Sequence, residues 1–269
     1  MRRLQGFVRA CHAPPTLAVS IVMTTFAWSL GWQGWSLALV FVTVLVGQLS
    51  VGWSNDAFDA AVDARAGRLR KPTVQNVVSA RALWIAASIA LVGAIALSWL
   101  VAGPIGGSFH IFAIAMGWLY TVALVRTSWS WLPYALAFGA MPFFLSLGLD
   151  GEFPPAWTVL AFATVAVSGH LANALPDLES DRAAGLGGLA VSLGERRSVL
   201  LCWVLLAVGT AVIALGTVAR SPLTAVVLVA VYLVVLAIGA RQTNHARRFQ
   251  ALLIIAIVDV VAIAVLPAL

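Results

Sequence analysis

Long apolar runs alternate with short polar segments along this 269-residue chain. A helix that crosses the hydrocarbon core of a bilayer needs about 17 to 25 mostly apolar residues. Runs of about this length occur at residues 14–31, 35–54, 77–102, 108–125, 131–149, 156–174, 198–218, 222–240 and 248–267. The pattern therefore predicts an all-α membrane protein with nine transmembrane helices.

The composition supports this reading and excludes an ordinary soluble domain. Apolar residues make up 62% of the chain and charged residues only 10%, with a mean hydropathy of +0.99, whereas about 25% of the residues in soluble domains are charged. The net charge of +6 could suggest nucleic acid, but the basic residues stand in short loops beside the apolar runs. Contact with anionic membrane lipids explains them better, and we expect no nucleic-acid partner.

The distribution of basic residues predicts the topology. Lysine and arginine are retained in cytoplasmic loops, and every basic residue except Arg220 falls on the same side of the nine predicted spans as the N-terminus. We therefore expect a cytoplasmic N-terminus and a C-terminus outside. We also expect residues 1–269 to form one membrane domain in the cell (inner) membrane. Its large cytoplasmic loops should lie at about 55–76 and 173–197.

An acidic pattern closes the second apolar run and returns at the end of the sixth. Its members, spaced four residues apart, are Asn55, Asp59, Asp63 and Gly67, and then Asn173, Asp177, Asp181 and Gly185. An even number of predicted crossings separates the two copies, so both should emerge at the cytoplasmic face. Unrelated solvated loops have no reason to share such a spacing, and we predict one site made from both.

The acidic pattern of the first copy calls for a positive partner. With 3.6 residues per turn, positions 55, 59 and 63 share one helical face, and Asp56 lies about 100° round from Asn55. These carboxylates crowd the negative end of the helix dipole and repel one another. Oxygen ligands without a cluster of cysteine or histidine suit Mg²⁺ better than zinc. The pattern therefore indicates a magnesium site.

Basic residues follow the acidic ones directly and extend the predicted ligand. Arg65, Arg68 and Lys71 could share the charge of a phosphate group. Mg²⁺ commonly bridges carboxylates to substrate phosphates. A diphosphate that is bound at the end of an apolar helix bundle is expected to bear a lipid tail.

The two acidic motifs resemble those of a known family, the UbiA superfamily of intramembrane prenyltransferases. The family motif N-D-x-x-D-x-x-x-D matches Asn55, Asp56, Asp59 and Asp63, and the second motif, D-x-x-x-D, matches Asp177 and Asp181. The resemblance covers the whole chain. It implies nine helices around a central cavity that opens sideways to lipid, with an active site at the cytoplasmic face.

The resemblance also implies roles for individual residues. Metal ligands, shared by two Mg²⁺ ions that bridge the diphosphate, would be Asp56, Asp59, Asp63, Asp177 and Asp181. Asn55, Lys71 and Arg126 would contact the substrate, and Tyr120 would be a catalytic neighbour of Arg126. Apart from the resemblance, the positions of Arg65, Arg68, Asn173 and Asp259 make them further candidates for substrate contact. The turn Thr73-Val74-Gln75-Asn76 departs from the Pro-Ser-Gly-like turn that is frequent in the family.

The expected activity is Mg²⁺-dependent loss of diphosphate from an allylic prenyl diphosphate, followed by transfer of the prenyl group to a lipophilic acceptor. A membrane terpene cyclase would use the same ionisation without an acceptor. A transporter or lipid-binding protein would also need helices, a cavity and basic loops, but it would not require paired carboxylate motifs. His170 could line the cavity or join two helices, and His12 is expected to be a structural residue at the membrane interface.

Asp259 stands alone within the last apolar run. An ionisable residue at that depth is costly and indicates a function by default, although a hydrogen bond to a neighbouring helix is an equal alternative. We expect Asp259→Asn to lower turnover while Mg²⁺-dependent substrate binding persists, which enzyme assays and binding isotherms can measure in parallel. Unchanged turnover would make Asp259 a structural residue.

Overall fold

The computed structural model describes residues 2–65, 67–183, 185–242 and 245–265. Within these residues the chain is helical and contains no strand. The elements are α1 (Arg2–Ala10), α2 (Ala13–Leu30), α3 (Gly34–Arg65), α4 (Ala80–Leu119), the π-helix η1 (Tyr120–Leu124), α5 (Leu132–Leu149), α6 (Ala156–Ala174), α7 (Leu178–Ala183), α8 (Leu189–Leu193), α9 (Glu195–Thr217), α10 (Pro222–Ala240) and α11 (His245–Val265).

Seven helices in the described part of the chain are long and apolar enough to cross a membrane. One of them, which covers Ala80–Leu124, contains two of the predicted runs. The apolar part of α11, Gln250–Val265, is shorter than these seven. The expectation of an all-α membrane bundle is confirmed, whereas nine crossings and the cytoplasmic N-terminus remain predictions.

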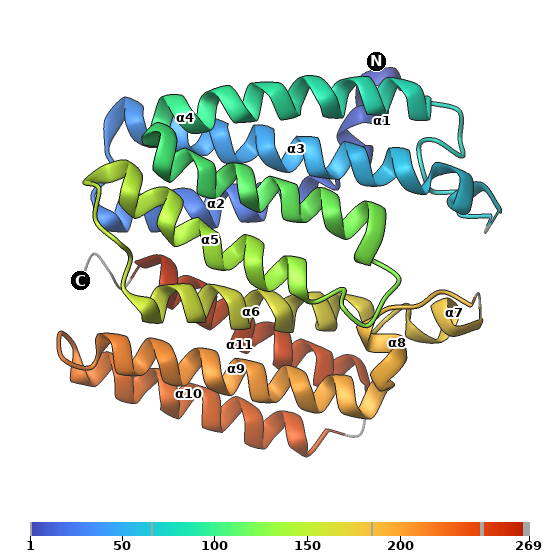
Figure 1. The fold of residues 1–269 in the computed structure, drawn as a ribbon. Coiled ribbons are helices and arrows are strands. Elements are labelled where there is room, and N and C mark those ends of the chain that lie inside the picture. The colour runs from blue at the N-terminus through green and yellow to red at the C-terminus, as the bar shows by residue number, and fades with distance from the viewer. Residues whose placement is uncertain (1, 66, 184, 243–244, 266–269) are drawn as a thin grey trace.

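Helix α4 folds back on itself near its middle. Gly103 has a φ of 65° and a ψ of −179°, a backbone conformation that is essentially restricted to glycine, and Pro104 follows it. Residues twelve apart in a straight helix would be about 18 Å apart, yet Ser98 Oγ lies 2.7 Å from His110 Nδ1. The two limbs of α4 are therefore antiparallel neighbours, as Figure 1 shows.

The long helices form a closed bundle. Consecutive helices pack side by side from α2 to α6 and again from α9 to α11, and α6 packs against α9. Helix α11 contacts both α6 and α2, so the last helix returns to the first long one. The closed arrangement gives every long helix a buried side and leaves the remainder of its apolar surface for lipid.

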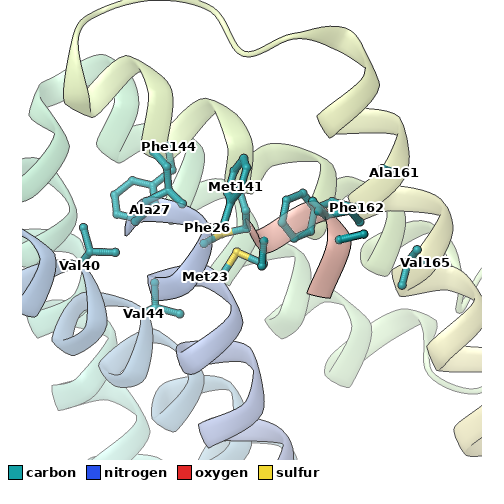
Figure 2. Packing of buried hydrophobic residues seen from close by; sticks show 14 of the residues in the cluster. Met23, Phe26, Ala27, Val40, Val44, Met141, Phe144, Ala161, Phe162 and Val165 are labelled. Carbon is teal, nitrogen blue, oxygen red and sulfur yellow. The ribbon is translucent and has the colours of Figure 1, made fainter. Parts of the chain in front are cut away.

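Apolar side chains fill the interior between α2, α3, α5 and α6 (Figure 2). Phe26 and Phe162 pack edge to face with ring centroids 5.0 Å apart, and both are almost fully buried together with Met23 and Phe144. Aromatic pairs in this geometry add to the stabilisation from burial alone. This filled interior fixes how α3 and α6 lie relative to each other, and those helices carry the two acidic motifs.

The acidic motifs lie at one end of the bundle. Helix α3 has 32 residues, several turns more than the roughly 20 that a bilayer requires, so its acidic last turns extend beyond the apolar part. Figure 1 shows the end of α3, the short helices α7 and α8, and α1 at the same end of the bundle, whereas α11 finishes at the other. The predicted convergence of the two motifs on one face is confirmed.

The α4 hairpin provides a test of the packing. A Cβ atom at Gly107 would overlap the carbonyl oxygen of Ser98, whereas one at Gly93 on the same helix would make an ordinary contact with Val46. Overpacking costs about 1–3 kcal/mol, so Gly107→Ala should lower the midpoint of thermal unfolding in detergent by several degrees. Gly93→Ala is the control and should not lower it; equal midpoints for the two variants would contradict the close approach of the limbs.

Candidate active site

The repeated spacing in the sequence corresponds to a repeated turn in the structure. Gly67 and Gly185 both adopt left-handed conformations, with φ of 64° and 68°. After each glycine the next N–H donates to the carbonyl oxygen of a motif aspartate: Arg68 to Asp63 at 3.0 Å, and Leu186 to Asp181 at 2.9 Å. This six-to-one bond is typical of a glycine-terminated helix end. The two acidic segments therefore end in the same way, with their last aspartates at equivalent positions.

The second acidic segment, unlike the first, does not lie on one continuous helix. Helix α3 continues through its motif to Arg65, but α6 ends at Ala174 and α7 starts only at Leu178. Pro176 in between has no N–H for a helical bond. As a result Asp177 lies in an exposed turn and Asn173 is exposed at the end of α6, whereas Asp181 belongs to α7. The expectation that the whole second motif ends the sixth long helix is corrected accordingly.

Asp56 is almost fully buried, and among the ion-paired residues of the site Asp63 alone is more buried. The Asp56 side chain is 1% exposed, and its Oδ1 atom accepts from Lys71 Nζ at 2.5 Å and lies 3.0 Å from His12 Nε2. Its Oδ2 atom is buried without a hydrogen-bond partner. A buried carboxylate oxygen in this state is costly, so Asp56 retains unused capacity for a ligand.

Helix α1 holds the loop that carries Lys71. Arg9 donates to the carbonyl oxygen of Arg70 at 2.5 Å and to Gln75 Oε1 at 3.0 Å. Gln75 in turn donates to the carbonyl oxygen of Leu69. Gln75 belongs to the turn that departs from the family pattern, and in this chain the departure provides the anchor for α1.

Arg68 joins the two acidic motifs. Its guanidinium lies 3.0 Å from Asp63 Oδ1 and 3.6 Å from Asp181 Oδ1. Asp63 is fully buried, and its Oδ2 atom, 3.9 Å from Lys71 Nζ, has no hydrogen-bond partner. Burial raises the pKa of the Asp181 carboxyl, and the positive charge of Arg68 opposes that shift. The two turns therefore share one basic residue at the surface of the bundle.

Arg126 forms the third ion pair, with Asp59 Oδ1 at 3.2 Å. Its backbone is fixed by the glycine-bearing loop, because any Cβ atom at Gly187 would overlap the carbonyl oxygen of Arg126. Asn55 donates weakly to Thr121 Oγ1 at 3.4 Å. η1 and the segment that follows it are thus tied to both motif regions.

A cavity of about 150 Å³ lies between the two motifs. Its lining includes Asp59, Arg68, Tyr120, Arg126, Ser130, His170, Asp181 and the backbone segment 186–191. The ring of Tyr120 meets the rings of Tyr134 and His170 edge on, with centroids 5.1 and 5.6 Å away. Carboxylates, guanidinium groups and aromatic rings thus face one small space.

Eight of the predicted residues are not among those lining this cavity: Asn55, Asp56, Asp63, Arg65, Lys71, Asn173, Asp177 and Asp259. Among the described residues, the side chain of Arg65 bonds to the carbonyl oxygen of Ala61 on its own helix. Asp259 is fully buried and accepts from Thr210 Oγ1 at 2.8 and 3.1 Å, so it joins α11 to α9. Neither residue is among those lining the cavity.

Sequence reasoning missed contributors from other parts of the chain. His12, expected to be structural, meets Asp56, and Ser130 lies in the cavity wall against His170. His170 does line the cavity, which was one of its two expected places. The sequence could single out the histidines, because their side chains are rare polar groups in an apolar chain. It could not single out Ser130, because no local pattern distinguishes one serine in a turn from another.

The residues present fit a magnesium ion bound together with a diphosphate. In the described residues no group of three or more His, Cys, Asp or Glu side chains is arranged to enclose a metal, so a cage made by the protein alone is excluded there. Mg²⁺ usually binds through one or two carboxylates, with water and substrate phosphates completing its shell. The unpartnered oxygens of Asp56 and Asp63 provide such donors.

Comparisons with known proteins show what the chain is similar to. The model of the UbiA prenyltransferase family matches residues 14–258. The chain is 31% identical to a protoheme IX farnesyltransferase of Chloroflexus aurantiacus over 47% of its own length and 22% of that protein's length. It is also 31% identical to a lycopene elongase/hydratase of Haloferax volcanii, over 59% of this chain and 54% of that one. The match therefore covers less than a quarter of the first relative and about half of the second.

Solved structures share the fold. A UbiA homologue from Archaeoglobus fulgidus, bound to DMAPP and Mg²⁺, superposes with a TM-score of 0.74 over 98% of this chain and 99% of its own. The two sequences are 17% identical, so the likeness establishes the fold and not the substrate.

The connection through Arg68 can be tested without any substrate. Arg68→Gln removes the charge that links Asp63 to Asp181, and hydrogen exchange of the backbone in 178–183 should rise by up to about fivefold, the equivalent of roughly 1 kcal/mol for a partly exposed ion pair. Arg65→Gln serves as the matched control, because Arg65 contacts only its own helix. Equal exchange in the two variants would show that Arg68 does not hold the motifs together.

Proposed function

The chain belongs to the UbiA prenyltransferase family, and we propose that it catalyses Mg²⁺-dependent transfer of a prenyl group from an allylic prenyl diphosphate to a lipophilic acceptor within the membrane. The observation that supports this most is the ion-pair contact of Arg68 with Asp63 and Asp181. It brings both acidic motifs to one cavity, as a single diphosphate headgroup would require.

The basic residues are suited to bind the diphosphate. Lys71, Arg68 and Arg126 now pair with Asp56, Asp63 and Asp59. A diphosphate that enters between these pairs would receive the cations as hydrogen-bond donors, and charge-assisted bonds of this kind are strong. The carboxylates released from them would then be free to hold metal. The observed ion pairs thus keep oppositely charged groups in position for an incoming substrate.

Asp56, Asp59, Asp63, Asp177 and Asp181 are proposed as the metal ligands. When bound, Mg²⁺ ions, proposed as two, would stabilise the negative charge that develops on the departing diphosphate. The protein's own contribution is to orient these carboxylates and to exclude water by the apolar interior. Asn55 and Asn173 are proposed to contact the headgroup, with a weaker role for Arg65.

The prenyl chain is proposed to lie against the apolar and aromatic interior. Heterolysis of the allylic C–O bond leaves positive charge on the chain, and the faces of aromatic rings attract such charge. Tyr120 stands between the charged end of the cavity and Tyr134, where its ring can meet the reacting carbon. The closely packed side chains below keep water away from the cation.

We further infer that the protein resides in the cell (inner) membrane, among membrane lipids, with the cavity opening to the cytoplasmic face. The excess of basic residues beside the motif loops supports this orientation. The two relatives, a protoheme IX farnesyltransferase and a lycopene elongase/hydratase, differ in what they act on. For this chain we propose only a lipophilic acceptor.

Removal of a metal-binding carboxylate should abolish most of the activity. Asp56→Ala and Asp177→Ala are each expected to cut pyrophosphate release by a hundredfold or more, on the order of the loss when one charge-stabilising group is removed. Glu152→Ala, in the exposed segment after α5, is the control and should retain wild-type release. Near-wild-type release by both aspartate variants would refute the proposed chemistry.

Product analysis separates transfer from its alternatives. Purified protein would be incubated with Mg²⁺ and prenyl diphosphates of different lengths, with and without membrane lipid extract, and the products would be identified by mass spectrometry. A prenylated product that appears only with extract supports transfer. A cyclic hydrocarbon without extract would favour a terpene cyclase, and binding without any pyrophosphate release would favour a transporter or lipid-binding protein.

A further inference from the structure

Ser130 and His170 form a hydrogen-bonded pair in the cavity wall to which the proposed function assigns no role. Ser130 Oγ lies 3.0 Å from His170 Nε2, and both residues line the same cavity as Asp59, Arg126 and Tyr120. The imidazole stacks on Tyr134 with ring centroids 4.4 Å apart, which fixes its plane. A serine hydroxyl and an imidazole therefore stand in fixed geometry beside the charged groups.

The bonds around Ser130 assign the direction of its hydrogen bond to His170. Ser130 Oγ accepts from the backbone N–H of Leu189 at 3.1 Å, and its own hydrogen has no other acceptor among the described contacts. A hydroxyl has one hydrogen to donate, and Nε2 is the acceptor within reach, so we assign this hydrogen to Nε2 and the ring proton to Nδ1. A hydroxyl that donates to an imidazole nitrogen is the arrangement from which a proton can be passed to the ring.

A second serine–histidine pair in the chain has the opposite arrangement. Ser98 Oγ gives its hydrogen to the carbonyl oxygen of Ala94 at 2.5 Å, so it must accept from His110 Nδ1, 2.7 Å away. That pair joins the two limbs of α4 and is not among the residues lining the cavity. The contrast separates a structural pair from one whose ring nitrogen is available as a base.

We propose that His170, acting through Ser130, accepts the proton of a lipophilic acceptor that bears a hydroxyl group, in the reaction proposed above. The acceptor oxygen forms a bond to the allylic carbon, and the C–O bond to diphosphate breaks with its electron pair on the diphosphate. The acceptor's proton passes to Ser130 Oγ as the proton of Ser130 passes to His170 Nε2. The imidazolium later returns this proton to diphosphate or to solvent.

The position of the pair supports an acceptor that approaches from the loop side. Leu189, which fixes Ser130, opens α8, and the segment 186–191 forms part of the cavity lining. Gly187 lets this segment pack against the carbonyl oxygen of Arg126. A polar acceptor group placed beneath it would meet Ser130 while Arg126 and Arg68 face the diphosphate.

The test compares His170→Gln with His110→Gln, using geranyl diphosphate, Mg²⁺ and a long-chain fatty alcohol as the hydroxyl acceptor. Glutamine can keep a hydrogen bond to Ser130, but its amide cannot accept a proton. Loss of a general base should lower kcat for formation of the prenyl ether on the order of a hundredfold, with little change in KM for the diphosphate. His110→Gln should leave kcat near the wild-type value.

Chemical rescue and a folding check complete the test. His170→Ala should lose the same activity and recover part of it when imidazole is added, which a purely structural role of the ring would not allow. Ser130→Ala should lower kcat as well, and unfolding midpoints would confirm that each variant is folded.

Wild-type rates of ether formation by His170→Gln would overturn the proposal, as would pyrophosphate release by the wild-type protein without any ether. So would equal losses in His170→Gln and His110→Gln, or the absence of any rescue by imidazole in folded His170→Ala. Failure of the wild-type protein to release pyrophosphate from any prenyl diphosphate would instead overturn the proposed function itself, and this inference with it.

Discussion

The charge balance at the end of α3 is the constraint on which the rest of the site depends. Asp56 and Asp63 are buried at the negative end of a long helix, where unpaired carboxylates are very unfavourable. Lys71 and Arg68 come from the loop that follows and neutralise them. Because Arg68 also reaches Asp181, the same charge that stabilises the first motif fixes the position of the second. The ion pairs that stabilise this end of the bundle are thus the same ones that are proposed to bind the substrate.

The bundle places these ion pairs where chemistry needs them. The hairpin of α4 and the contacts of α11 with α2 and α6 close the bundle, and packed aromatic residues such as Phe26 and Phe162 fill its interior. The charged groups of the two motifs therefore lie at one end, above an interior of packed apolar side chains. An electrostatic interaction at that end is stronger than it would be in water, and the proposed carbocation would be shielded from solvent beneath it.

The loops around the cavity act as a single unit. Arg9 of α1 holds the loop that carries Lys71, and the segment after α7 packs on Arg126 through Gly187. Ser130 connects that same segment to His170 on α6. In each of these contacts a residue from one element positions a group that belongs to another. A change in one loop is therefore expected to displace side chains carried by another.

The sequence by itself determined the membrane helices and the presence of two matching acidic turns, because helical periodicity, apolar length and glycine-terminated helix ends are local properties. Tertiary structure alone decided that Arg126 meets Asp59, that His12 meets Asp56, and that Ser130 meets His170. These partners stand between 40 and 67 residues apart, and their meeting depends on how each helix is rotated and packed, which no local pattern encodes.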